Sequence, residues 1–225
     1  MLKGHRMKTI FDWLTMPAFR ERMGMYIGQH DLSTLNNWMH GYISACEDAK
    51  EHERLRTPNG IPIDLLRDYI AMKEGDSSTG GIPYILQAAA NGNVQEAVDR
   101  FFSYVDEFMR LEIKLIQRAQ PTDEMQQYYS DRYHMTLDHI PTAYRKISLT
   151  DGLCWLVVEA PDSEYYFRDI CETAPELRFS GEYSIGPESW AERFLTAAYG
   201  ESLQWVVTDE SCYPQTKSNT ESITC

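Results

Sequence analysis

Apolar residues recur at helical spacing through the first half of the chain. They fall three or four positions apart from Leu32 to Cys46, and again from Val94 to Met109. Because an α-helix turns once in about 3.6 residues, this spacing places each series on one face of a helix. The pattern predicts helices over about 8–22, 33–52, 63–74, 82–90 and 93–117. We therefore expect a helical domain over residues 1–120.

Capping residues and a proline indicate where these helices begin. Asp31 or Ser33 can cap the second helix and Asn93 the last, since a side-chain oxygen there accepts a hydrogen bond from the first turn. Pro17 can occupy a first helical turn or divide the segment over 8–22 in two.

Three glycines carry further expectations. Gly24 and Gly28 bracket the residues "MYI", which we expect to be extended, within a turn that sets the angle between the first two helices. Tyr26 in this turn should be at least partly buried. Gly41 lies inside a predicted helix, where glycine costs about 1 kcal/mol relative to alanine. We expect close contact with another backbone at Gly41.

The pattern changes to β-rich runs after about residue 120. In "AYRKISLTDGLCWLVVEA" two such runs flank Thr150-Asp151-Gly152, which predicts a β-hairpin. "ELRFSGEYSI" and "LQWVVTDE" are further strand candidates, while "EYYFRDICETA" and "GPESWAERFLTAAYG" favour helices. We predict an α+β fold: a helical N-terminal unit followed by a smaller mixed α/β domain over 121–210 that carries a small antiparallel sheet. The polar tail over 211–225 should be mobile.

Negative charge is concentrated in the second half. Residues 1–120 hold 16 acidic and 14 basic residues, a net charge of −2, whereas residues 121–225 hold 18 and 7, a net charge of −11. An acidic surface repels nucleic acid and attracts basic proteins. Solubility alone also accounts for an acidic chain. The expected partner is therefore a protein and not a nucleic acid.

The densest acidic stretch runs from Glu159 to Glu192 and also contains aromatic residues. Rings supply contact area at an interface, and charges steer association. The residues that we expect to contact a basic partner are Asp162, Glu164, Tyr165, Tyr166, Asp169 and Glu172. The alternative is a solvated acidic face whose rings turn inward.

Common catalytic and cofactor motifs are missing from the sequence. It contains no phosphate-binding loop, no Gly-x-Gly-x-x-Gly and no His-Glu-x-x-His. His134 and His139 lie five positions apart, a spacing that does not bring two imidazoles to one helical face. Phe101 and Phe102 lack the basic surroundings of a nucleic-acid platform and are expected in the core. We predict no metal site and no cofactor.

The cysteines and the apolar runs bear on location. The five cysteines are widely spaced without a Cys-x-x-Cys pair, and no apolar run approaches the roughly 20 residues that span a bilayer. The first residues contain no apolar signal segment, so we expect reduced thiols, a cytoplasmic protein and no membrane contact. Cys154, inside an apolar strand, is expected to be a buried and inert thiol.

The stretch "RERMGMYIG" at Arg20–Gly28 resembles the Arg-Pro-Gly-Met-Tyr-Ile-Gly segment that opens the ATP-binding domain of gyrase B subunits. In that family the next helix carries a Glu that activates water and an Asn that holds magnesium. Here Asn36 and Asn37 come too early in "STLNNWMHGYISACED", with no Glu before them, and no Asp-x-Gly-x-Gly follows. We therefore expect no ATP binding.

A longer resemblance covers about residues 8–112. The segments "IFDWL", "RMGMYIG", "LNNWMHGYISA" and "AVDRFFSYVDEF" are similar, in order and spacing, to a family of bacterial immunity-type proteins found beside polymorphic toxins. Met23 replaces the proline usual in that family. The resemblance implies a protein that binds and neutralises a cognate toxin, but it identifies neither the toxin nor any binding residue. Turn formation and core packing can also explain these glycines, tyrosines and phenylalanines.

Two functions follow from the sequence. The first is a non-enzymatic immunity protein for a cognate toxin, with a basic nuclease as the toxin class that the charge favours. The alternative is an enzyme of unknown type, for example a nucleotide-handling one, whose site is assembled from scattered residues.

Overall fold

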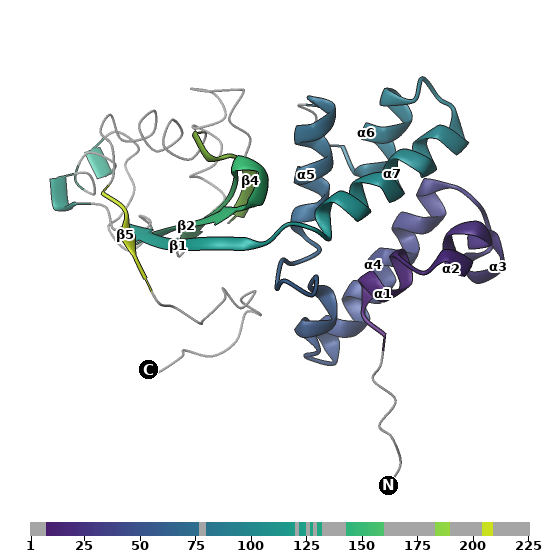
Figure 1. Ribbon diagram of the computed structural model, residues 1–225, viewed down its shortest axis with the longest axis horizontal. Coiled ribbons are helices and arrows are strands. Elements are labelled where there is room, and N and C mark those ends of the chain that lie inside the picture. Colours follow the sequence, from purple (N-terminus) through teal and green to yellow (C-terminus); the bar gives the residue numbers. More distant parts are fainter. Residues whose placement is uncertain are drawn as a thin grey trace, which may run out of the picture.

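The structure is a computed structural model that describes residues 8–76, 80–119, 122–124, 127, 130–131, 143–159, 183–189 and 204–208. Helices come first along the chain and a five-stranded antiparallel sheet follows, which confirms the predicted α+β fold. Figure 1 shows the helices on one side of the molecule and the sheet on the other, with α7 leading into β1.

The helices of the first half are mostly short. Their bounds are α1 Ile10–Leu14, α2 Pro17–Glu21, α3 Met23–Ile27, α4 Leu32–Asp48, α5 Leu65–Glu74, α6 Ile82–Ala89 and α7 Val94–Phe108. The Asp31 carboxylate accepts a hydrogen bond from Thr34 N at 2.9 Å, and Asn93 Oδ1 accepts one from Glu96 N at 3.1 Å. Both predicted caps are therefore confirmed, with Asp31 and not Ser33 at the start of α4.

Pro17 divides the first predicted helix into α1 and α2 and occupies the first position of α2, as its fixed φ and missing N–H allow. The prediction of an extended "MYI" segment is wrong, because Met23–Ile27 forms the short helix α3. A Cβ on Gly24 would lie 3.7 Å from the Gln29 carbonyl carbon, so the chain after Gly28 folds back closely against α3. Gly28 ends the helix at φ 100°, a backbone conformation that favours glycine.

Within the described residues, no other backbone makes the close contact that was expected at Gly41. Apart from its chain neighbours and the backbone of α4, none of their atoms lies within 4 Å of the position that a Gly41 Cβ would occupy, and the residue is exposed on α4. The glycine therefore weakens the helix, and no described residue makes a contact that requires it.

The last predicted helix ends earlier than expected. It stops at Phe108, and Ile113–Ala119 forms strand β1, where Ile116 pairs with Ile147 of β2. The apolar spacing around Ile116 suits a helix as well as a strand, and pairing within the sheet decides between them. The proposed boundary between two domains at residue 120 stays a prediction.

The sheet has the strand order β4-β3-β2-β1-β5. Its further bounds are β2 Ala143–Leu149, β3 Leu153–Glu159, β4 Tyr183–Pro187 and β5 Val206–Val207. β2 and β3 form the predicted hairpin around Thr150–Gly152, in which Asp151 and Gly152 adopt φ values of 61° and 67°. Cys154 on β3 is fully buried, as predicted.

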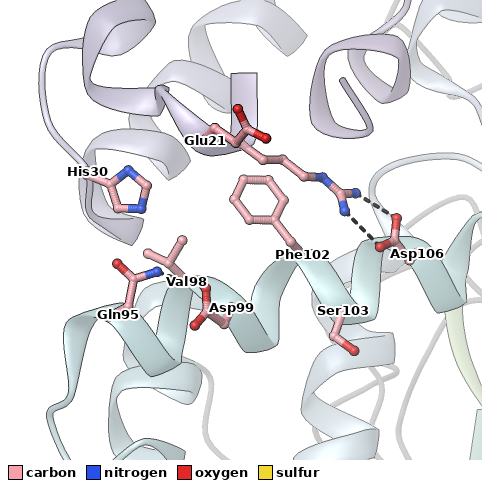
Figure 2. Close-up of a pocket in the computed structure, with 9 residues that line it drawn as sticks. Glu21, His30, Gln95, Val98, Asp99, Phe102, Ser103 and Asp106 are labelled. Atoms are coloured by element: carbon pink, nitrogen blue, oxygen red, sulfur yellow. Dashed lines mark hydrogen bonds and ion pairs between the residues drawn. The ribbon is translucent and has the colours of Figure 1, made fainter. Parts of the chain in front are cut away.

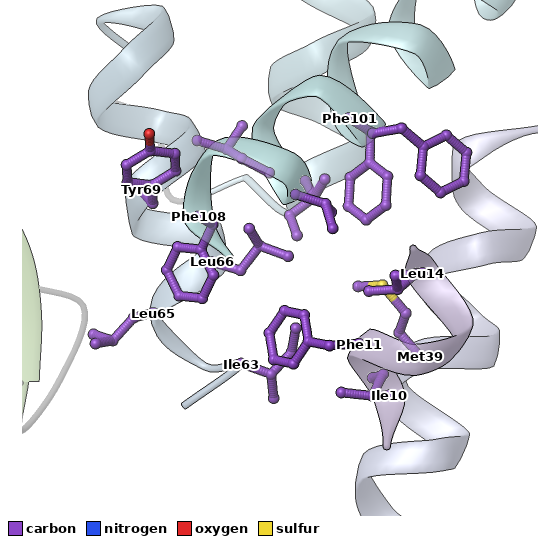
Figure 3. Close-up of a cluster of buried hydrophobic side chains, with 14 of the residues drawn as sticks. Ile10, Phe11, Leu14, Met39, Ile63, Leu65, Leu66, Tyr69, Phe101 and Phe108 are labelled. Carbon is purple, nitrogen blue, oxygen red and sulfur yellow. The ribbon is translucent and has the colours of Figure 1, made fainter. Parts of the chain in front are cut away.

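One cluster of buried apolar side chains joins the helices to the sheet. Figure 3 shows its helical part, where Phe11 of α1 lies against Phe108 of α7 with ring centroids 6.0 Å apart. Phe101 is 1% exposed and Phe102 7% exposed, which confirms their predicted place in the core. Ile147, Trp155 and Ile185 extend the same cluster into the sheet, and α5 packs against β4.

A polar seam joins α5 to α7 beside this core. Lys73 Nζ lies 2.7 Å from Glu107 Oε2, to which the Tyr69 hydroxyl donates a hydrogen bond at 3.1 Å. The Tyr104 hydroxyl donates to Glu74 Oε1 at 2.7 Å. Burial, followed by the hydrogen bond to Glu74, raises the pKa of Tyr104 to about 12. Burial and the charge of Glu107 also raise the pKa of Tyr69, so the seam keeps both phenols protonated to a higher pH than an ordinary tyrosine.

Among the described residues, no helix combines the length and the apolar character needed to cross a bilayer.

Candidate protein-binding surface

The six residues predicted to contact a partner, from Asp162 to Glu172, lie outside the described residues. The strands on either side of them are placed: β3 ends at Glu159, β4 begins at Tyr183, and the two strands are antiparallel neighbours. The predicted acidic contact patch stays a prediction.

A set of linked aromatic rings forms a different surface on the helical unit. Phe19 of α2 is buried at its centre, with ring centroids 5.5 Å from Tyr26 of α3 and 5.2 Å from Trp38 of α4. Trp13 of α1 lies 6.1 Å from Tyr26 and 6.4 Å from Trp38. Tyr42 extends the set along α4, 5.7 Å from Trp38. The rings of four helices thus support one another.

The outer rings of this set are accessible to solvent. Tyr26 is 49% exposed, so half of its surface is covered by Trp13 and Phe19 and half faces outward. Trp13, Trp38 and Tyr42 are partly exposed. We call these four residues (Trp13, Tyr26, Trp38 and Tyr42) the aromatic surface. Met25 precedes Tyr26 on α3 and is 80% exposed.

Two cations border the aromatic surface. Lys8 Nζ lies 4.4 Å from the Trp13 ring centroid, and the Arg54 guanidinium carbon lies 5.1 Å from that of Tyr42. The Tyr42 hydroxyl donates to the Lys8 carbonyl oxygen at 2.5 Å and accepts a hydrogen bond from Arg54 at 2.7 Å. Burial raises the pKa of Tyr42, although the Arg54 charge opposes this shift. Tyr42 is thereby fixed in one orientation at the edge of the surface.

Small residues lie beside these rings on α4. Trp38, Gly41, Tyr42 and Ala45 are spaced by three and four positions, so they share one face of the helix. Gly41 and Ala45 are both exposed, and Gly41 has open space around it. Two rings and two small residues together form a ledge that a partner backbone can approach closely.

The described residues provide no obvious arrangement for catalysis. Among them, no group of three or more His, Cys, Asp or Glu residues could hold a metal ion. The pKa of Asp31 is lowered by the backbone hydrogen bond from Thr34 in a helix cap. The other shifted groups belong to the polar seam, to the Tyr42–Arg54 contact, to the ion pairs of Arg100 with Glu96 and Glu74, or to an ion pair between Arg20 and Asp106. Each shift therefore has a structural cause.

The sequence contained a signal for this surface. Trp38, Gly41 and Tyr42 stand in the segment "WMHGY", and Met25 and Tyr26 stand in "GMYIG". Core packing accounts for Phe19 but not for the half-exposed Tyr26 or the exposed Met25. The decisive feature was Gly41, a glycine within a helix, because no described residue makes the backbone contact expected there.

Comparisons of this chain with protein-family models, with curated proteins and with solved structures give no match. Function must therefore be inferred from the residues themselves.

Proposed function

We propose that this protein is a non-enzymatic immunity-type protein, which binds a cognate bacterial toxin and neutralises it. The aromatic surface and the small residues beside it on α4 form its contact with the toxin. The observation that carries the proposal is the exposure of Met25, Tyr26 and Gly41 on folded helices. These residues belong to the segments that resemble the immunity-type family.

The composition of the surface suits a protein interface. Tyrosine and tryptophan are enriched among the residues that dominate binding energy, because they bury a large area with few rotatable bonds. Methionine adapts to irregular partner surfaces. The four rings are held by contacts with one another and with Phe19. Little side-chain freedom remains for a partner to restrict, which favours affinity.

The stability that the protein loses through Gly41 also supports a partner at this position. A glycine in an exposed helix lowers stability by about 1 kcal/mol relative to alanine. No described residue approaches Gly41 closely enough to require it. A partner that packs against α4 at this position would require it, since any side chain there would hold the two backbones apart.

The net charge of −13 supports a basic partner. Nuclease toxins must bind phosphates and therefore carry basic surfaces, and opposite net charges accelerate association at low ionic strength. The predicted patch from Asp162 to Glu172 would add to this steering.

A binding experiment with matched variants tests the proposal. The partner is the toxin domain encoded beside the gene of this protein, purified and titrated calorimetrically. Met25→Glu places a charge on the proposed interface and should weaken binding by about tenfold, the scale of a contact residue of moderate importance. Tyr84→Glu is the control, because Tyr84 is a 61% exposed aromatic on α6 that does not belong to the aromatic surface. Equal affinities of the two variants would reject the aromatic surface as the contact.

A further inference from the structure

The short helix α3 holds two methionines with opposite surroundings. Met23 is fully buried, whereas Met25, two positions later, is 80% exposed. Among the described residues, Met25 has the largest exposed fraction of any large apolar side chain. The other methionines that the structure describes are buried or partly buried: Met16, Met23, Met39, Met72 and Met109.

The Met25 side chain does not belong to the core cluster. Helix α3 is held instead by Met23, which does, and by Tyr26, whose ring centroid lies 5.5 Å from that of Phe19. A chemical change at the end of the Met25 side chain should therefore leave α3 and the core in place. It would alter the surface beside the half-exposed ring of Tyr26.

A thioether that is open to solvent reacts with peroxides. The sulfur lone pair attacks one oxygen of hydrogen peroxide, the O–O bond breaks, and the sulfur gains that oxygen while the peroxide is reduced to water. This two-electron oxidation converts an apolar, flexible side chain into a polar and chiral sulfoxide. A buried thioether, as in Met23 and Met39, can react only when the chain opens locally.

We propose that Met25 is a modification site, at which oxidation to the sulfoxide by a peroxide weakens binding of the toxin. The proposal rests on the proposed function and adds a means of regulation at the same surface. A partner packed over Met25 and Tyr26 would have to strip water from the sulfoxide oxygen, which costs free energy unless a hydrogen bond replaces it. Methionine sulfoxide reductases reverse the oxidation, so the change in binding is reversible.

The first part of the test measures which methionine reacts. The full chain is treated with hydrogen peroxide and digested with trypsin, whose cleavage after Arg22 and Lys50 leaves Met23, Met25 and Met39 in one peptide. Tandem mass spectrometry should show Met25 oxidised at least about tenfold faster than the two buried methionines. Equal rates for the three would overturn the assignment of the site.

The second part measures toxin binding by calorimetry before and after peroxide. We expect the affinity of the wild type to fall about tenfold, the scale of a contact residue of moderate importance. Methionine sulfoxide reductase should restore it, whereas a thiol reductant alone, which reverses disulfides and sulfenic acids, should not. Met25→Leu, compared only with its own untreated form, should show no effect of peroxide. Met72→Leu changes a partly buried methionine of α5 and should respond as the wild type does.

The outcomes separate this proposal from the function on which it rests. Unchanged toxin affinity after complete oxidation of Met25 would overturn the proposal and leave toxin binding in place. An equal effect of peroxide on Met25→Leu would assign the loss to another residue and overturn it as well. If the untreated wild type does not bind the toxin, the proposed function is wrong and the effect on binding falls with it.

Discussion

Arg20 of α2 and Asp106 of α7 form a bidentate ion pair across 86 positions of the chain. Arg20 Nε also donates to the Leu14 carbonyl oxygen at 2.6 Å, at the end of α1. One side chain therefore connects three helices that the sequence separates widely. Short helices such as α1 and α2 have little stability of their own, so such tertiary contacts hold them in place.

Replacement of Arg20 by lysine tests this connection. Lysine keeps the charge but cannot form the paired hydrogen bonds or lie flat on Phe102. Arg20 is 23% exposed and Asp106 is 43% exposed, so solvent screening limits the loss. We expect the free energy of unfolding to fall by about 1 kcal/mol. Urea denaturation measures the free energy of unfolding, with Arg22→Lys at an exposed position as the control. An Arg20→Lys protein as stable as the wild type would contradict the proposed role of Arg20 in connecting the three helices.

Acid should destabilise the protein through Asp106 and Glu107. The hydrogen bond from Arg20 lowers the pKa of Asp106. Burial alone would raise the pKa of Glu107, but the hydrogen bonds from Lys73 and Tyr69 outweigh it and the net shift is downward. A carboxyl group whose pKa is lower in the folded state stabilises the fold above its unfolded pKa. This stabilisation is lost as the pH falls through the lowered value.

Urea denaturation between neutral pH and about pH 3 measures this loss, since unfolded carboxyl groups titrate near pH 4. Asp106→Asn removes one of the two contributions, so its free energy of unfolding should depend less steeply on pH. Identical pH dependence in wild type and variant would show that the Arg20–Asp106 pair makes no such contribution.

Alkaline pH should destabilise the protein through the polar seam between α5 and α7. The pKa of Tyr104 is raised to about 12, and burial and the charge of Glu107 also raise the pKa of Tyr69. A raised pKa in the folded state stabilises the fold below the ordinary tyrosine value of about 10, and this contribution is lost as the pH rises further. A phenolate absorbance titration should show late-titrating tyrosines, one fewer in Tyr104→Phe. If the titration of Tyr104→Phe lacks a tyrosine that titrates near pH 10 instead, the pKa of Tyr104 is not raised and the prediction is wrong.

Gly41 gives opposite expectations for stability and for binding. Gly41→Ala should raise the free energy of unfolding by about 0.5–1 kcal/mol, because the helix gains propensity and no described residue beyond its chain neighbours and the backbone of α4 lies within 4 Å of the new methyl group. Gly41→Gln should also fold well but should weaken toxin binding, since it blocks the ledge. His40→Gln, at an exposed position on another face of α4, is the matched control. Full toxin affinity in Gly41→Gln would exclude close approach at α4.

Local signals predicted where α4 and α7 begin. Asp31 and Asn93 act through neighbouring residues, so their roles as caps can be read from short segments. The strand Ile113–Ala119 could not be identified in this way, because its pairing partners lie around Ile147 and Val207. An apolar run that suits both helix and strand is decided by such distant pairing.

The candidate surface was only partly predictable for the same reason. Trp38, Gly41 and Tyr42 share a helix, and their common face follows from their spacing. Trp13 and Tyr26 join them only through the packing of three helices around Phe19. The meeting of Arg20, Glu21 and Asp99 at a hollow between α2 and α7 (Figure 2) likewise depends on how these two helices pack.

The most direct test of the proposed function is a titration of the toxin's activity with the purified protein. A non-enzymatic inhibitor that forms a tight complex removes activity in linear proportion to the amount added and abolishes it at equimolar concentration. Neutralisation of the neighbouring toxin in this stoichiometric manner is the predicted result. No inhibition, or progressive inactivation by far less than an equimolar amount, would contradict a binding mechanism, and the latter result would indicate an enzyme.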